Sequence, residues 1–96
     1  MVKHIVLFEF KDENRQDNIQ KAKEMLENLI DSVPTLNSIE VGVNFSTEDR
    51  AMDLSIITAF DNELGLKEYA THPEHLKVVE FIKTVVKSSK VSDYYI

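Results

Sequence analysis

The chain has 96 residues, a formal net charge of −6 and no cysteine. The absence of cysteine excludes disulfides, thiolate metal sites and cysteine nucleophiles, and the acidic balance disfavours nucleic acid and anionic membrane surfaces as partners. With 43% hydrophobic and 29% charged residues, the sequence is typical of a folded protein and predicts one domain over residues 1–96. We recognise no targeting leader or membrane-spanning apolar run, so we expect a cytoplasmic protein.

Residues 2–10 alternate in the manner of a β-strand. The two faces carry His4, Val6, Phe8 and Phe10 on one side and Lys3, Ile5, Leu7 and Glu9 on the other. Because large apolar side chains occur on both faces, the pattern predicts a central strand that is covered on both sides.

A helix is predicted after the polar segment 11–18. Apolar residues recur at helical spacing from Ile19 to Val33. Asp12 or Asn14 is available as the N-cap, and Pro34 is expected to end the segment.

Two strands are predicted in the middle of the chain. In residues 39–45, large apolar side chains alternate with Glu40, Gly42 and Asn44, which is typical of an edge strand. The polar cluster 46–50 predicts a hairpin loop. Residues 52–60 then form a strand that is apolar on both faces, so it is expected to be central like residues 2–10.

The last third of the chain predicts two helices and a strand. Asp61 or Asn62 can cap a short helix that includes Tyr69. Pro73 suits the first position of the next helix, which makes His72 its capping residue. That helix is expected to present a common face formed by His75, Val79, Ile82 and Val86. Residues 91–96 are predicted to be the final strand.

The order of these elements predicts an α+β fold, namely a ferredoxin-like four-stranded antiparallel sheet with helices on one face. The two doubly apolar strands take the middle positions in this topology. Helices from one chain cover only one face of such a sheet. We therefore expect a homodimer in which a second copy packs sheet against sheet.

Three stretches of the chain resemble the stress-responsive dimeric A/B barrel (Dabb) domain family. They are MVKHIVLFEFKD, then IEVGVNFS followed by RAMDLSIITAFD, and EYATHPEHLKVVEFIK. The resemblance covers essentially the whole chain, and its most specific part is KHIVLF combined with YxxHPxH. It implies a ferredoxin-like protomer and a dimeric α/β barrel. Members of the family include plant stress-associated proteins, bacterial proteins without a defined role and a plant polyketide cyclase that makes olivetolic acid.

Similarity to the cyclase implies three candidate catalytic residues, His4, Tyr69 and His75. The predicted elements agree, because His4 lies on an inward strand face while the other two lie on apolar helix stripes that pack on that sheet. A pocket between sheet and helices would bind a small, partly apolar molecule. There a neutral histidine removes a proton beside a carbonyl group and a tyrosine hydroxyl stabilises the enolate. This chemistry suits a cyclase or isomerase that needs no cofactor.

Two other interpretations remain open from the sequence. In a non-catalytic structural stress protein, the same three residues would hydrogen-bond one another and hold the core together. A haem-degrading or cofactor-free monooxygenase would use the same dimeric barrel, although only fold analogy points to it. His72 and His75 have no third ligand with a defined place beside them, so no metal site is predicted.

Overall fold

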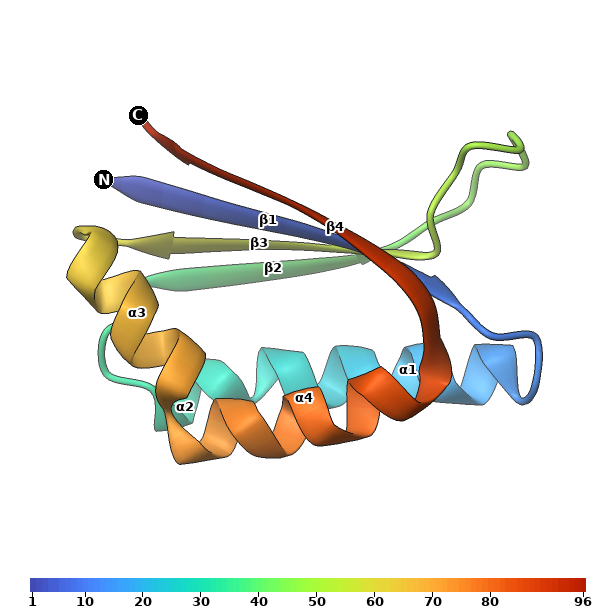
Figure 1. Cartoon of the computed structure of the whole chain (residues 1–96), viewed down its shortest axis with the longest axis horizontal. Coiled ribbons are helices and arrows are strands. Elements are labelled where there is room, and N and C mark those ends of the chain that lie inside the picture. Colours follow the sequence, from blue (N-terminus) through green and yellow to red (C-terminus); the bar gives the residue numbers. More distant parts are fainter.

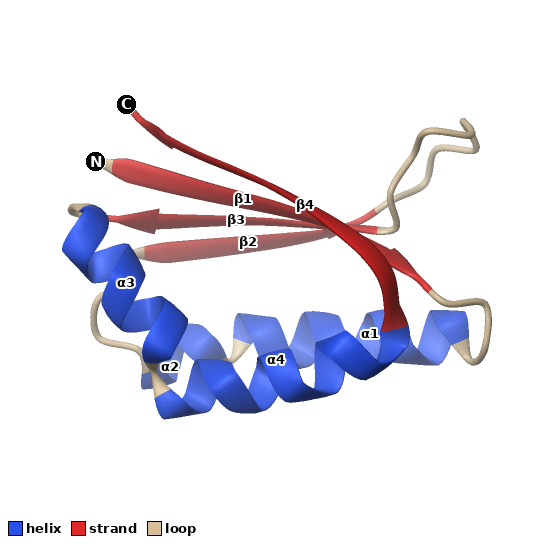
Figure 2. Cartoon of the chain, in the orientation of Figure 1, coloured by secondary structure: helices blue, strands red, loops and turns tan.

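Four strands form one antiparallel sheet in the computed structural model, which describes all of residues 1–96. In chain order the elements are β1 (Val2–Phe10), α1 (Arg15–Glu27), α2 (Leu29–Ser32), β2 (Ser38–Val43), β3 (Leu54–Phe60), α3 (Glu63–Thr71), α4 (Pro73–Val85) and β4 (Val86–Tyr95). The strand order is β2-β3-β1-β4, and all the helices lie on one side of the sheet (Figures 1 and 2). The predicted ferredoxin-like arrangement, with the first and third strands central, is confirmed. None of the helices is long and apolar enough to cross a membrane.

The core lies between the inner face of the sheet and the helices. Antiparallel partners share a face of the sheet, so the pairing of Val6 with Ile56 and of Phe8 with Leu54 brings the large inward side chains of β1 and β3 together. The helices contribute buried residues at helical spacing, Ile19, Ala22 and Leu26 from α1 and Val78 and Ile82 from α4. One continuous cluster therefore joins both layers.

The predicted first helix is interrupted at Asn28. Helix α1 ends at Glu27, and the short helix α2 carries the chain on towards Val33, which is buried. Asn14 occupies the N-cap position of α1 with φ of 50°, but its side chain makes no capping hydrogen bond. Asparagine tolerates this left-handed conformation better than most residues, so Asn14 serves the turn and not the cap.

The caps predicted for the later helices are confirmed. The side chain of Asn62 accepts a hydrogen bond from the backbone N–H of Gly65 at 2.9 Å, at the start of α3. The ring of His72 accepts one from the backbone N–H of Glu74 at 3.1 Å, and Pro73 opens α4. Both side chains satisfy N–H groups that have no partner within their helix.

The hairpin between β2 and β3 is longer than predicted. Strand β2 ends at Val43 and β3 begins at Leu54, so Phe45 is not an inward strand residue and is 97% exposed. The side chain of Asn44 forms hydrogen bonds with both the N–H and the C=O of Ser46, at 3.0 and 2.9 Å. Such local side-chain bonds compete with the ladder of a sheet, which explains why the strand stops there.

The final strand begins five residues earlier than predicted. Helix α4 ends at Val85 and β4 starts at Val86 with no intervening loop, so the prediction of Val86 as a helix residue was wrong. Phe10 pairs with Val86 and Glu9 with Ser88, and the register shift between them leaves Lys87 as an extra residue. Because a bulge of one residue exchanges the two faces, Val86 rather than Lys87 faces the core.

Asp53 ties the start of β3 to the end of β1 and to α1. Its carboxylate accepts hydrogen bonds from the backbone N–H of Phe10 at 2.7 Å and from the guanidinium of Arg15 at 3.1 Å. The Asp53 side chain is only 17% exposed, so water would replace these partners poorly. Arg15 also pairs with Asp12, whose side chain is 97% exposed.

We expect Asp53→Ala to lower the free energy of unfolding by about 1–3 kcal/mol, because it leaves the Phe10 N–H without its acceptor. Chemical denaturation followed by circular dichroism measures this change. Asp12→Ala is the matched control: it removes a carboxylate from the same arginine at an exposed position and should change the unfolding free energy by less than about 0.5 kcal/mol. Equal effects of the two substitutions would contradict this account.

Candidate functional site

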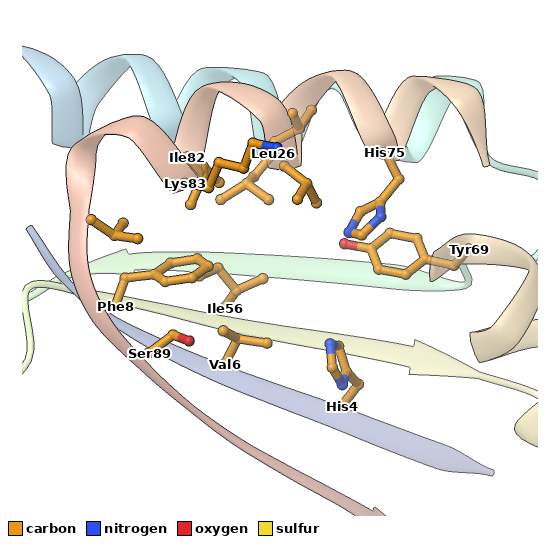
Figure 3. A pocket seen from close by; sticks show the side chains of 13 residues that line it. His4, Val6, Phe8, Leu26, Ile56, Tyr69, His75, Ile82, Lys83 and Ser89 are labelled. Carbon is orange, nitrogen blue, oxygen red and sulfur yellow. The ribbon is translucent and has the colours of Figure 1, made fainter. Parts of the chain in front are cut away.

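A cavity of about 300 Å³ lies between the inner face of the sheet and α4 (Figure 3). Its apolar lining comes from five elements and consists of Val6, Phe8, Leu26, Ile56, Val78, Val79, Ile82 and Val86. Its polar lining consists of His4, Tyr69, His75, Lys83 and Ser89. A largely apolar wall with a few convergent polar groups is typical of a small-molecule site.

The three residues singled out from the sequence lie together at one end of this cavity. The rings of Tyr69 and His75 have centroids 4.3 Å apart, and those of His4 and Tyr69 are 6.4 Å apart. They come from β1, α3 and α4, and Figure 3 shows the Tyr69 hydroxyl directed towards the His75 ring. The fold therefore gathers residues that are up to 71 positions apart in the sequence.

His75 is a neutral imidazole, and one of its ring nitrogens is hydrogen-bonded to the backbone. Its Nδ1 lies 3.1 Å from the carbonyl oxygen of Ala70, and because a carbonyl only accepts hydrogen bonds, Nδ1 must carry the proton. In the neutral ring Nε2 is then unprotonated and can act as a base. Burial lowers the pKa of His75 below its ordinary value of 6.5; the hydrogen bond to Ala70 opposes this shift, and the neighbouring His4 and His72 add to it. His75 is therefore neutral at pH 7.

Tyr69 supplies a hydroxyl that stays protonated. Its side chain packs on Phe60, with ring centroids 5.1 Å apart, and the residue is only 3% exposed. Burial raises the pKa of Tyr69 to about 12, because the apolar surroundings disfavour the phenolate. At neutral pH this group donates a hydrogen bond and does not act as a base.

His4 is oriented by Asp93, which sequence reasoning missed. The two residues are register partners on β1 and β4, and the Nδ1 of His4 contacts a carboxylate oxygen of Asp93. Since the carboxylate is an acceptor, it favours the tautomer with the proton on Nδ1 and leaves Nε2 free. In the sequence, Asp93 alternates in step with Val91 and Tyr95, so the three side chains share one face of the strand. That pattern could have pointed to Asp93, but only the pairing of β4 with β1 places it opposite His4.

Lys83 and Ser89 were also missed. Ser89 lies on the strand side, at the far end of the cavity from Tyr69 and His75, whereas Lys83 lies on the helix side with its side chain running back along α4 (Figure 3). Lys83 is four residues beyond Val79 and eight beyond His75, so helical periodicity alone puts all three on one face of α4. His72, in contrast, caps α4 and does not line the cavity. No group of three or more His, Asp and Glu side chains is arranged to hold a metal ion.

Comparison with known proteins places this geometry in a family. The chain is 26% identical to a stress-response A/B barrel domain-containing protein of Arabidopsis thaliana, over 96% of this chain and 83% of that protein. A dimeric ferredoxin-like protein of unknown function from Bacteroides fragilis is 31% identical, with a TM-score of 0.91 over 99% of this chain and 95% of the other. A hydroxynitrile lyase from Passiflora edulis shares the fold at 21% identity, with a TM-score of 0.87 over 99% and 92% of the two chains. The model of the stress-responsive A/B barrel domain matches residues 2–96, and this chain belongs to that family.

Proposed function

We propose that this protein binds a small, partly apolar carbonyl compound in the cavity and catalyses proton transfer at the carbon next to the carbonyl group. One observation carries the proposal. A neutral histidine with an unprotonated Nε2 lies against a protonated tyrosine at the polar end of an apolar cavity. A base and a hydrogen-bond donor so placed are what enolate formation requires.

The proposed reaction uses the chain's own groups. His75 Nε2 takes the proton from the α-carbon, and the electron pair of the broken C–H bond forms the enolate. The Tyr69 hydroxyl donates a hydrogen bond to the enolate oxygen, and His4, oriented by Asp93, is a second polar group beside it. Return of the proton from His75 to carbon completes an exchange or isomerisation. If the enolate carbon instead attacks a second carbonyl of the same ligand, a C–C bond forms and closes a ring. The alkoxide left on the attacked carbonyl then takes the proton from His75.

The hydrogen bonds of the three residues favour this function over a purely structural one. A structural cluster would satisfy its members mutually, whereas His75 bonds to the backbone of Ala70 and His4 to Asp93. Their remaining ring nitrogens and the Tyr69 hydroxyl are available to a ligand. The hydroxynitrile lyase from Passiflora edulis is similar in fold only, so the proposal rests on the cavity and not on that enzyme's activity.

We further propose that the protein acts as a homodimer formed through the outer face of the sheet. No helix covers this face (Figure 2), yet it carries Ile5 and Leu7 on β1 and Ile57 on β3, which are half-buried in the isolated chain. A second copy would remove these side chains from water. The relative from Bacteroides fragilis is dimeric, which supports a dimer here, while the choice of this face rests on its partly exposed apolar side chains.

The protein should accelerate hydrogen–deuterium exchange at the α-carbons of an aliphatic ketone such as nonan-2-one in D₂O, measured by ¹H NMR against buffer. His75→Gln should reduce the enzymatic rate by about 10²–10⁴ because it removes the base. Tyr69→Phe should reduce it by about 10²–10³ because it removes the donor to the enolate oxygen.

His72→Asn is the matched control for these substitutions. It replaces the third histidine of the same segment, which caps α4 outside the cavity, and asparagine preserves the cap. Well above pH 6.5, where His75 is unprotonated with or without His72, its exchange rate should equal that of the wild type. A wild-type rate no greater than that of buffer would refute the catalytic proposal.

The exchange rate should fall with acid at a midpoint below pH 6.5, because burial lowers the pKa of His75 below that of an ordinary histidine. The folding stability should fall over the same acidic range. There the unfolded chain, with an ordinary histidine, binds a proton that the folded chain does not, so acid favours unfolding. An NMR titration of the histidine Cε1 protons measures this directly. A His75 midpoint at or above 6.5 would contradict the assignment.

Sedimentation velocity should detect a dimer of the wild-type protein, and Leu7→Glu should convert it to a monomer by placing a charge in the proposed interface. Leu76→Glu makes the same change on α4, where Leu76 is 51% exposed, and should leave the dimer intact. A monomeric wild-type protein, or a folded Leu7→Glu dimer, would exclude this interface.

A further inference from the structure

The cavity has a second polar end that the proposed reaction does not use. Lys83 lines it from α4 on the helix side and Ser89 from β4 on the opposite, strand side (Figure 3). Lys83 lies eight residues beyond His75 on a continuous helix, which corresponds to about 12 Å along the axis. A ligand that contacts both ends must therefore be elongated.

The ammonium group of Lys83 has no carboxylate partner within the protein. Lys77 on the same helix pairs with Glu74 at 3.1 Å, and Lys23 on α1 pairs with Glu27 at 2.8 Å. Lys83 forms no such pair, and none of the 13 residues that line the cavity is acidic. The alkyl stem of a lysine packs readily along an apolar wall while its charged end stays accessible. This leaves one free positive charge at this end of the cavity.

We infer that the ligand is an anionic amphiphile, an aliphatic keto acid whose carboxylate binds Lys83 while its carbonyl group lies between Tyr69 and His75. The Ser89 hydroxyl lies across the cavity from Lys83, on the inward face of β4 opposite Phe8. The apolar wall between the two ends contacts the alkyl chain. This inference rests on the proposed function, because it assumes that the carbonyl lies at the His75 end.

Because the protein has a negative net charge, comparing an acid with its neutral analogue tests whether a local cation contacts the ligand. At −6, the long-range field repels an anion, so the acid would bind no better than a neutral analogue unless a local cation contacted it. A charge-assisted hydrogen bond to the carboxylate opposes that repulsion where the two groups meet. Preference for the acid is therefore a direct readout of Lys83.

The test compares 9-oxodecanoate with its neutral methyl ester, which has the same ketone and chain. Dissociation constants measured by isothermal titration calorimetry should be about tenfold lower for the acid. Lys83→Met keeps the apolar stem without the charge, so it should abolish this preference by weakening binding of the acid more than binding of the ester. Lys83→Arg should restore the preference.

Lys77→Met is the matched control, because it removes the same charge from the solvent side of the same helix. It should keep the tenfold preference for the acid. If the ester binds and undergoes α-proton exchange but the acid binds no better, the role of Lys83 is wrong and the proposed function stands. If the preference persists in Lys83→Met, Lys83 is again excluded as its source. If neither compound binds, both the inference and the proposed function fail.

Discussion

The pairing of β4 with the full length of β1 is the constraint on which the site depends. Helix α4 and strand β4 are joined without a loop at Val85 and Val86, so the two elements diverge directly from that point (Figure 1). The ladder with β1 holds β4 in the sheet, while α4 packs against α1 and the core cluster. The cavity occupies the space between them. His75 lies where α4 and β4 are far apart, and Ser89 lies close to their junction. Each position is fixed by the place of the residue along its own helix or strand.

Much of the fold was predictable because the two central strands have large apolar side chains on both faces. That pattern and the order of elements were sufficient to predict the topology, now confirmed. The limits of the elements were less predictable. The polar run from Lys87 to Lys90 has no apolar alternation, because β4 is an edge strand whose inner side lines a cavity instead of packing tightly. Likewise, only the side-chain bonds of Asn44 explain why β2 excludes Phe45.

The candidate site was predictable only in part, and the reason is again register. His4, Tyr69 and His75 each lie on an inward face that periodicity identifies within one element. Asp93 becomes a partner of His4 only through the alignment of two strands, which a single sequence does not determine. Lys83 resembles any solvated lysine on a helix until the neighbouring strand is placed beside it. The polar residues of the cavity could therefore be identified only once the elements were placed side by side. Its apolar wall, in contrast, could be predicted from the periodicity of each element alone.

The contact between His4 and Asp93 spans 89 positions of the chain. The ribosome synthesises the chain from its N-terminal end, so β1 is made first and β4 last. The two strands therefore cannot pair until almost all of this segment has been synthesised. During that interval one edge of a strand with large apolar side chains on both faces is unpaired, a state in which strands associate with foreign partners. Completion of the site and protection of the nascent chain from aggregation therefore occur in the same step.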